Sequence, residues 1–230
     1  MGRDLFQTPW KEIKREVSVQ QTLIPGVDLK ERFQRAAEFG FDGVELAVWG
    51  FESPIADHFE EIDEAKRASG IAVSSICTSS ADDLVHPEAV EREKRLTGLV
   101  HYLQIAEALG ASGVIALLLC PPVRLPDLSP VGDETSLITR LLLASLQTAL
   151  DQTAEARAAV FLEPLNRYEA RYLRTIGHAA ELCETLGSAR VRVMAFLPHE
   201  HRGGPSRPGL EAGGRTCWAC PPGRQPATRT

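Results

Sequence analysis

A glutamate closes an apolar run of the chain and is closely followed by further polar side chains. The run Ala159–Leu162 ends at Glu163, and Asn166, Arg167 and Glu169 come soon after it. A carboxylate in an apolar setting is costly to bury unless it is paired or binds a metal ion. Carboxylates also serve as general acids and bases and as ligands of hard divalent ions. Glu163 is therefore a candidate for proton transfer or metal binding, and pairing with a nearby arginine is the structural alternative.

Glu45 is a second carboxylate of this kind. It lies in the apolar stretch Gly43–Val48, which we interpret as a strand with Glu45 at its functional end. If both strands belong to one parallel barrel, polar residues at their carboxyl ends lie on the face where such enzymes place their active sites. Pairing of Glu45 with a local arginine is an equally good interpretation of the residue.

The segments around these glutamates alternate between strand-like and helical patterns. Short apolar or alternating runs predict strands, and runs with helical spacing, opened by Asp28 or a proline and closed by glycines, predict helices. The predicted strands are 17–23, 43–48, 71–77, 114–120, 159–163 and 191–194. The predicted helices are 28–40, 54–69, 87–109, 137–157 and 176–186.

Repeated strand–helix units with apolar strands predict an α/β fold with a parallel sheet covered by helices. A (β/α)8 TIM barrel and a doubly wound open sheet both fit this pattern. No Gly-x-Gly-x-x-Gly motif follows the first strand and no phosphate-binding loop occurs, so the nucleotide-binding open sheets are disfavoured. We therefore predict a TIM barrel. It is incomplete, because barrel-like sequence stops in the sixth strand, after about five to six β/α units.

Two motifs resemble one family. Gly40–Glu45 (Gly-Phe-Asp-Gly-Val-Glu) and Leu162–Glu169 (Leu-Glu-Pro-Leu-Asn-Arg-Tyr-Glu) resemble the xylose-isomerase-like sugar isomerase/epimerase superfamily, most closely its tagatose-type ketose 3-epimerases. The resemblance covers residues 17 to 194. It implies that Glu163 is both a metal ligand and an acid/base carboxylate. It also implies substrate binding by Glu169 with Arg167 in support, and we assign Glu45 and Asn166 to the same role.

The resemblance further implies a reaction and a cofactor. Moving a proton at a carbon beside a carbonyl needs a base and a stabiliser of the enediolate oxygens. In the family a divalent ion (Mn²⁺, Mg²⁺ or Co²⁺) is held by Glu, Asp, His and Glu from strands five to eight. Only the first of these ligands, Glu163, is recognisable here, so we expect that this chain does not hold the ion stably and is inactive. Thr78 and Cys120 stand where related DNA-repair nucleases have histidines, which disfavours a nuclease.

The last 33 residues, 198–230, differ from the rest of the chain. They hold 6 of the 15 prolines and 6 of the 18 glycines, and they carry five arginines, no lysine and two acids. Leu210 is their one residue among Val, Ile, Leu, Met and Phe. Such a segment cannot bury enough apolar surface to offset its ordering entropy. We therefore predict one folded domain, 1–197, and an irregular tail, 198–230, that is disordered or out of frame.

Translation out of frame from about residue 195 explains the tail best. When 199–204 and 217–225 are back-translated and read one nucleotide later, they can encode Met-Ser-Ile-Glu-Glu and Val-Gly-His-Val-His-Leu-Ala-Asp-Ser. Both motifs belong to the superfamily, and they occur in one frame at the family's spacing. The alternative is a non-catalytic binding or scaffold protein with a flexible or zinc-linked extension, in which His199, His201, Cys217 and Cys220 form a metal site or a redox pair.

Composition limits the partners. The formal net charge is −6 and no dense stripe of Lys and Arg occurs, which argues against nucleic acid and anionic membranes. No apolar run approaches the roughly 18 residues of a membrane span, and we see no signal sequence. We expect a cytoplasmic protein with reduced thiols. A small sugar is the expected partner, and the intact family is expected to form homo-oligomers.

Overall fold

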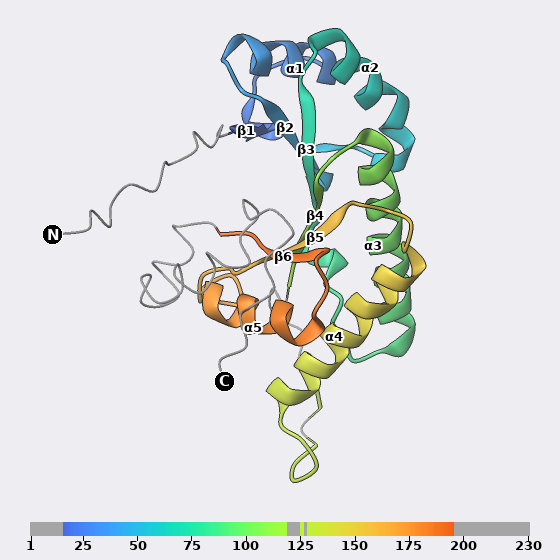
Figure 1. Cartoon of the computed structure of the whole chain (residues 1–230), viewed down its shortest axis with the longest axis vertical. Coiled ribbons are helices and arrows are strands. Elements are labelled where there is room, and N and C mark those ends of the chain that lie inside the picture. Colours follow the sequence, from blue (N-terminus) through green and yellow to red (C-terminus); the bar gives the residue numbers. More distant parts are fainter. Residues whose placement is uncertain (1–15, 119–124, 127, 196–230) are drawn as a thin grey trace, which may run out of the picture.

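The computed structural model describes residues 16–118, 125, 126 and 128–195. Within them, six strands form one parallel sheet, in which each strand is hydrogen-bonded to the next strand of the chain (Figure 1). The strands are β1 (Ser18–Gln20), β2 (Gly43–Ala47), β3 (Ala72–Cys77), β4 (Gly113–Leu117), β5 (Ala159–Glu163) and β6 (Val191–Val193). The α-helices are α1 (Leu29–Glu38), α2 (Phe59–Ser69), α3 (Ala89–Leu109), α4 (Glu134–Gln152) and α5 (Ile176–Leu186).

The order of the strands decides between the two folds that the sequence pattern allows. The sheet runs β1-β2-β3-β4-β5-β6 without a reversal. A doubly wound sheet changes direction at a switch point, whereas a barrel adds each new strand beside the previous one. The prediction of a partial barrel of five to six units is therefore confirmed. Within the described residues, β1 and β6 each have one neighbouring strand, so both edges of the sheet are unpaired.

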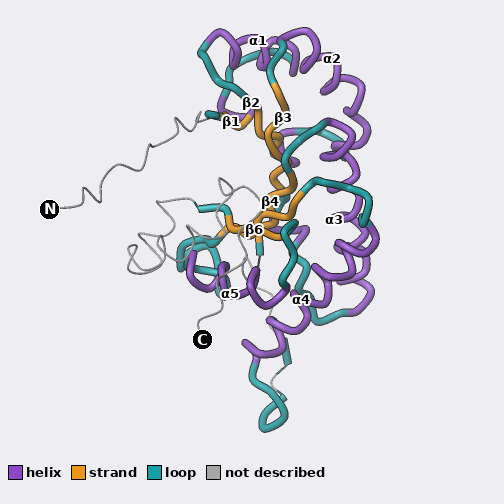
Figure 2. Tube along the Cα trace, viewed as in Figure 1, coloured by secondary structure: helices purple, strands orange, loops and turns teal. Residues whose placement is uncertain are grey.

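Helices cover the outside of the curved sheet, with α2, α3 and α4 following one side of it (Figures 1 and 2). The main core lies between these layers and is filled by fully buried side chains such as Phe33, Ile62, Leu103, Leu142 and Leu162. Alternate strand residues point to the other side of the sheet, where Cys77, Ile115, Ala159 and Phe161 form a smaller apolar cluster. None of the described helices is both long and apolar enough to cross a membrane.

Several predicted boundaries are confirmed. β5 and α5 begin and end at the predicted residues. Asp28 caps α1, since its side chain accepts from the backbone N–H of Glu31 at 2.8 Å. The helix predicted over 137–157 is displaced, because Asp133 caps α4 by accepting from the N–H of Ser136 at 2.7 Å and so starts the helix at Glu134.

The strand predicted over 17–23 is wrong in its second half. β1 stops at Gln20, and Gln21–Leu23 form a turn of 3₁₀ helix. The cause is the Gln21 side chain, which is fully buried and hydrogen-bonds both backbone groups of Ala47. A buried amide needs such partners, so the chain leaves the sheet at the point where Gln21 reaches β2.

Candidate active site

Glu163 lies at the carboxyl end of β5, as predicted. Its side chain is buried, with 8% of the residue exposed, and it has no hydrogen-bond or ion-pair partner among the described residues. Burial, together with the negative charges of Glu45 and Glu169, raises the pKa of Glu163 to about 7. A carboxyl group with this pKa is present in both its protonated and its charged form at neutral pH, which suits a group that takes and returns a proton.

Asn166 organises the turn that follows Glu163. It is almost fully buried, and its side-chain carbonyl accepts from the N–H of Tyr168 at 3.0 Å. Its backbone carbonyl accepts from the N–H groups of Glu169 at 3.0 Å and Ala170 at 2.9 Å. Its side-chain amide also donates to a carboxylate oxygen of Glu169. Asn166 therefore fixes the backbone and the side chain of Glu169, and we call residues 166–170 the Asn166 turn.

Arg167 does not contact Glu169 in the described hydrogen bonds. Its guanidinium donates to the hydroxyl of Tyr168 at 2.9 Å and lies 4.9 Å from the centre of that ring. Both side chains are exposed. The two residues therefore form an exposed cation–π pair beside the Asn166 turn. Among the described residues, Asn166 donates a hydrogen bond to Glu169, and support of Glu169 by Arg167 stays a prediction.

Glu45 is not at the end of its strand, so that part of the prediction is wrong. It is the third of the five residues of β2. Gln20 donates to one of its carboxylate oxygens at 2.8 Å and Ser75 to the other at 3.4 Å. The pairing with arginine considered above is therefore replaced by neutral donors from the neighbouring strands β1 and β3. Glu45 lies deeper inside the barrel than a residue at the strand end would.

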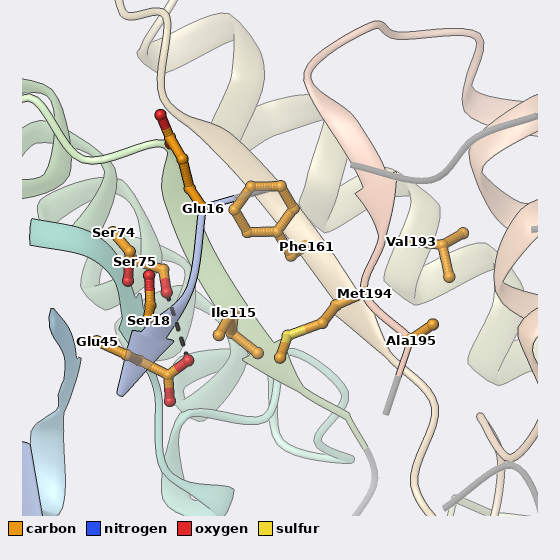
Figure 3. A pocket seen from close by; sticks show the side chains of 10 residues that line it. All are labelled: Glu16, Ser18, Glu45, Ser74, Ser75, Ile115, Phe161, Val193, Met194 and Ala195. Atoms are coloured by element: carbon orange, nitrogen blue, oxygen red, sulfur yellow. Dashed lines mark hydrogen bonds between the residues drawn. The ribbon is translucent and has the colours of Figure 1, made fainter. Parts of the chain in front are cut away.

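A cavity of about 290 Å³ opens beside Glu45, between the two edges of the sheet (Figure 3). One wall is polar and comes from β1, β2 and β3, where Ser18, Glu45, Ser74 and Ser75 point inward (Figure 3). The hydroxyl of Ser74 is buried there without a described partner. The opposite wall is apolar and comes from β4, β5 and β6, and it includes Ile115, Phe161, Val193, Met194 and Ala195.

Sequence reasoning missed Cys77, which faces the same interior. Burial and the charges of Glu45 and Glu163 raise the pKa of the Cys77 thiol, so at neutral pH it is a neutral apolar neighbour and not a thiolate. The alternation of side chains along β3 does not by itself predict which way Cys77 faces. The pairing of β2 with β3 shifts at an irregularity between Val44 and Glu45, and the sequence contains no sign of this shift. Thr78, the next residue, bridges β3 and β4 by donating to the carbonyl of Ile115 at 3.0 Å.

The described residues do not fit the metal site that the family resemblance implies. Among residues 16–118, 125, 126 and 128–195, no group of three or more His, Cys, Asp and Glu side chains could hold a metal ion. Glu163 is the one predicted ligand in this part of the chain. Four further candidates, His199, His201, Cys217 and Cys220, lie outside the described residues, as do Cys120 and the predicted domain boundary at 197.

A comparison with known protein families agrees with this fold. The model of the family described as xylose isomerase-like TIM barrel matches residues 33–216. The chain belongs to this family. The suspected relationship to xylose isomerase-like sugar isomerases and epimerases is thereby confirmed.

Relatives of this xylose isomerase-like barrel include sugar epimerases. The chain is 28% identical over 182 residues to 3-dehydro-D-guloside 4-epimerase of Escherichia coli (strain K12), an alignment that covers 75% of this chain and 64% of the relative. The chain thus spans less than two thirds of the length of this relative.

Solved structures show the same fold. The structure of 3-keto-D-glucoside 4-epimerase from E. coli in its apo form has a TM-score of 0.75 at 20% identity, covering 88% of this chain and 76% of the other. D-Psicose 3-epimerase from Clostridium cellulolyticum H10 with D-tagatose has a TM-score of 0.71 at 17% identity, covering 88% and 71%. At these identities the likeness establishes the barrel fold of the chain.

Proposed function

We propose that this chain carries part of the active site of a sugar isomerase or epimerase, which moves a proton on a ketose or a keto-glycoside through an enediolate. The observation that carries the proposal is the Glu163 carboxyl group. It is buried at the carboxyl end of β5, where barrel enzymes place their catalytic groups. The names of the epimerase relatives support the class of substrate.

Glu163 is the proposed proton carrier. The base removes a proton from the carbon beside the carbonyl, and the same proton or another is returned to give the isomer. Its raised pKa of about 7 lowers the cost of holding that proton between the two steps. The proposed role of Glu169 is to accept hydrogen bonds from sugar hydroxyls, and its hydrogen bond from the Asn166 side-chain amide supports this role by orienting the carboxylate.

The described residues are not sufficient for the whole reaction. Glu45 is engaged by Gln20 and Ser75 inside the barrel, and the described side chains include no cluster of three or more His, Cys, Asp and Glu that could hold a metal ion. We therefore propose that the 230-residue chain does not turn over a sugar. We propose dependence on Mn²⁺, Mg²⁺ or Co²⁺ only for a protein in which the alternative reading frame after codon 195 is restored.

The test compares the frame-restored protein with the 230-residue chain. We expect the restored protein to interconvert epimers of ketoses or keto-glycosides, measured by chromatography, and chelation to abolish this activity. Glu163→Gln should lower turnover by about 10²–10⁴-fold, the usual contribution of an acid–base group. Glu181→Gln, on the exposed face of α5, is the matched control and should leave the rate unchanged. Near-full activity of Glu163→Gln would overturn the proposal, as would stop codons in the alternative frame.

A further inference from the structure

One carboxylate joins the segments that follow β4 and β5. Arg171, in the segment between β5 and α5, donates to a carboxylate oxygen of Glu134 at 2.8 Å. The backbone N–H of Leu125, in the segment between β4 and α4, donates to the other oxygen of Glu134 at 3.2 Å. Both side chains of the ion pair are about one third exposed, 30% for Arg171 and 32% for Glu134. Glu134 is therefore a bridge between two loops at the carboxyl edge of the sheet.

A second contact, next to this bridge, also attaches the segment after β5 to α4. Thr139 in α4 donates to the carbonyl of Thr135 at 2.9 Å, so its hydroxyl oxygen is left to accept from the hydroxyl of Tyr172 at 2.6 Å. Tyr172 is buried, and its ring meets that of His178 edge to face at 4.6 Å between centres. Residues 171 and 172 are thus both attached to the first turns of α4.

These contacts affect the Asn166 turn because a backbone hydrogen bond joins the two ends of the segment 165–173 that contains it. The N–H of Leu165 donates to the carbonyl of Leu173 at 3.0 Å. The Asn166 turn lies between these two residues, in a short closed loop that also carries 171 and 172. The contacts of 171 and 172 with α4 therefore constrain where the turn lies.

Helix capping does not explain the hydrogen bonds of the Glu134 side chain. The first turn of α4 is capped by Asp133, which accepts from the N–H of Ser136, so the Glu134 side chain is not needed for that role. A carboxylate at this position also interacts favourably with the helix dipole. Its side-chain oxygens nevertheless accept hydrogen bonds from the two neighbouring loops.

We propose that Glu134 is a positioning residue, which through Arg171 holds the Asn166 turn, and with it Glu169, in the place where the sugar is bound. The structural part of this proposal stands on the hydrogen bonds above. The part that concerns the sugar rests on the proposed function.

The first experiment measures amide hydrogen exchange in the full chain and needs no activity. In Glu134→Gln we expect the amides of Leu165, Glu169 and Ala170 to exchange about fivefold faster, as loss of a partly exposed ion pair implies. The amide of Ser136 should keep its rate, because Asp133 still caps the helix. Glu181→Gln is the control and should change none of these amides. Unchanged exchange at Glu169 and Ala170 would overturn the proposal, and so would a general loss of protection throughout α4.

The second experiment uses the frame-restored protein and separates binding from turnover. Glu134→Gln and Arg171→Gln should each raise KM about threefold to fivefold with kcat within twofold of the parent. Arg171→Lys should recover most of the loss, and the double variant should be no worse than either single variant, because both remove the same contact. An unchanged KM, or additive losses, would contradict the positioning role. If the restored parent has no activity, the proposed function fails, and the exchange rates alone then decide whether Glu134 fixes the turn.

Discussion

The buried side-chain amide of Gln21 forms two hydrogen bonds with the backbone of Ala47. The amide nitrogen donates to the carbonyl of Ala47 at 2.8 Å, and the amide oxygen accepts from its N–H at 2.7 Å. This pair extends the contact between β1 and β2 past the last residue of β1. It also fixes the start of the loop after β2 at the carboxyl edge of the sheet.

Gln21→Glu should destabilise the chain in a way that depends on pH. A charged carboxylate can accept from the N–H of Ala47 but cannot donate to its carbonyl, and it is buried, so we expect a loss of about 3 kcal/mol at pH 7. The protonated acid restores the donor. The pKa of the introduced carboxyl group is therefore raised in the folded state. The stability of the variant is retained at low pH and lost as the pH rises. Urea unfolding at pH 4 and pH 7 measures the difference. Gln34→Glu, exposed on α1, is the control, and equal losses in both variants would contradict the prediction.

Glu163 should lower the free energy of unfolding of the metal-free chain at neutral pH and above. Its pKa in the folded state is raised to about 7, so the contribution to stability is complete below the unfolded value and is lost as the pH rises through about 7. Glu163→Gln removes this dependence. We expect the variant to gain of the order of 3 kcal/mol on the parent between pH 4 and pH 8. Denaturant unfolding with a chelator present measures the gain, and a constant difference across this range would refute the raised pKa.

Gly113→Ala should be strongly destabilising, because an added Cβ would overlap the backbone carbonyl of Ala159 in the adjacent strand β5. Backbone atoms of a central strand cannot move aside cheaply, so we expect a loss of more than about 2 kcal/mol. Gly98→Ala is the matched control. It lies inside α3 with no atom within 4 Å of the added Cβ, and it should stabilise the chain by about 0.5–1 kcal/mol. Thermal unfolding of the two variants should give shifts of opposite sign.

Within residues 16–195, as far as the structure describes them, the outer edges of β1 and β6 are unpaired, and we expect the 230-residue chain to self-associate through them. Exposed strand edges pair readily with other chains, and charges at an edge prevent this. Val17, next to β1, is 53% exposed, and Val17→Lys should therefore increase the fraction of monomer in light scattering. Val90→Lys, at a residue 76% exposed at the start of α3, should not. A monodisperse parent monomer with a sharp cooperative melt would contradict the prediction.

Local sequence patterns were sufficient to place the candidate residues that lie on one strand and its loop, while their roles stay predictions. Glu163 could be predicted because a carboxylate that ends an apolar strand stands out from its neighbours. Asn166 and Glu169 followed from the motif after that strand. These residues are neighbours in the sequence and also in space, and β5 has the predicted bounds.

Contacts between segments far apart in the chain could not be predicted in this way. Glu45 lies within its strand because β2 continues to Ala47, and its partner Ser75 depends on the shifted pairing of β2 with β3. Gln21 has the polarity of a loop residue, and only the nearby backbone of Ala47 makes it a buried one. Glu134 has the pattern of an ordinary first residue of a helix, and its contact with Arg171 links positions 37 residues apart.

The unbroken order of the strands has a consequence for synthesis on the ribosome. Each strand pairs with the one that emerged just before it, so the sheet can grow vectorially, one strand and helix at a time. If the reading frame shifts after β6, as we propose, every earlier pairing stays unchanged. The nascent chain would then fold up to β6, and cellular proteases and chaperones would meet a largely native body.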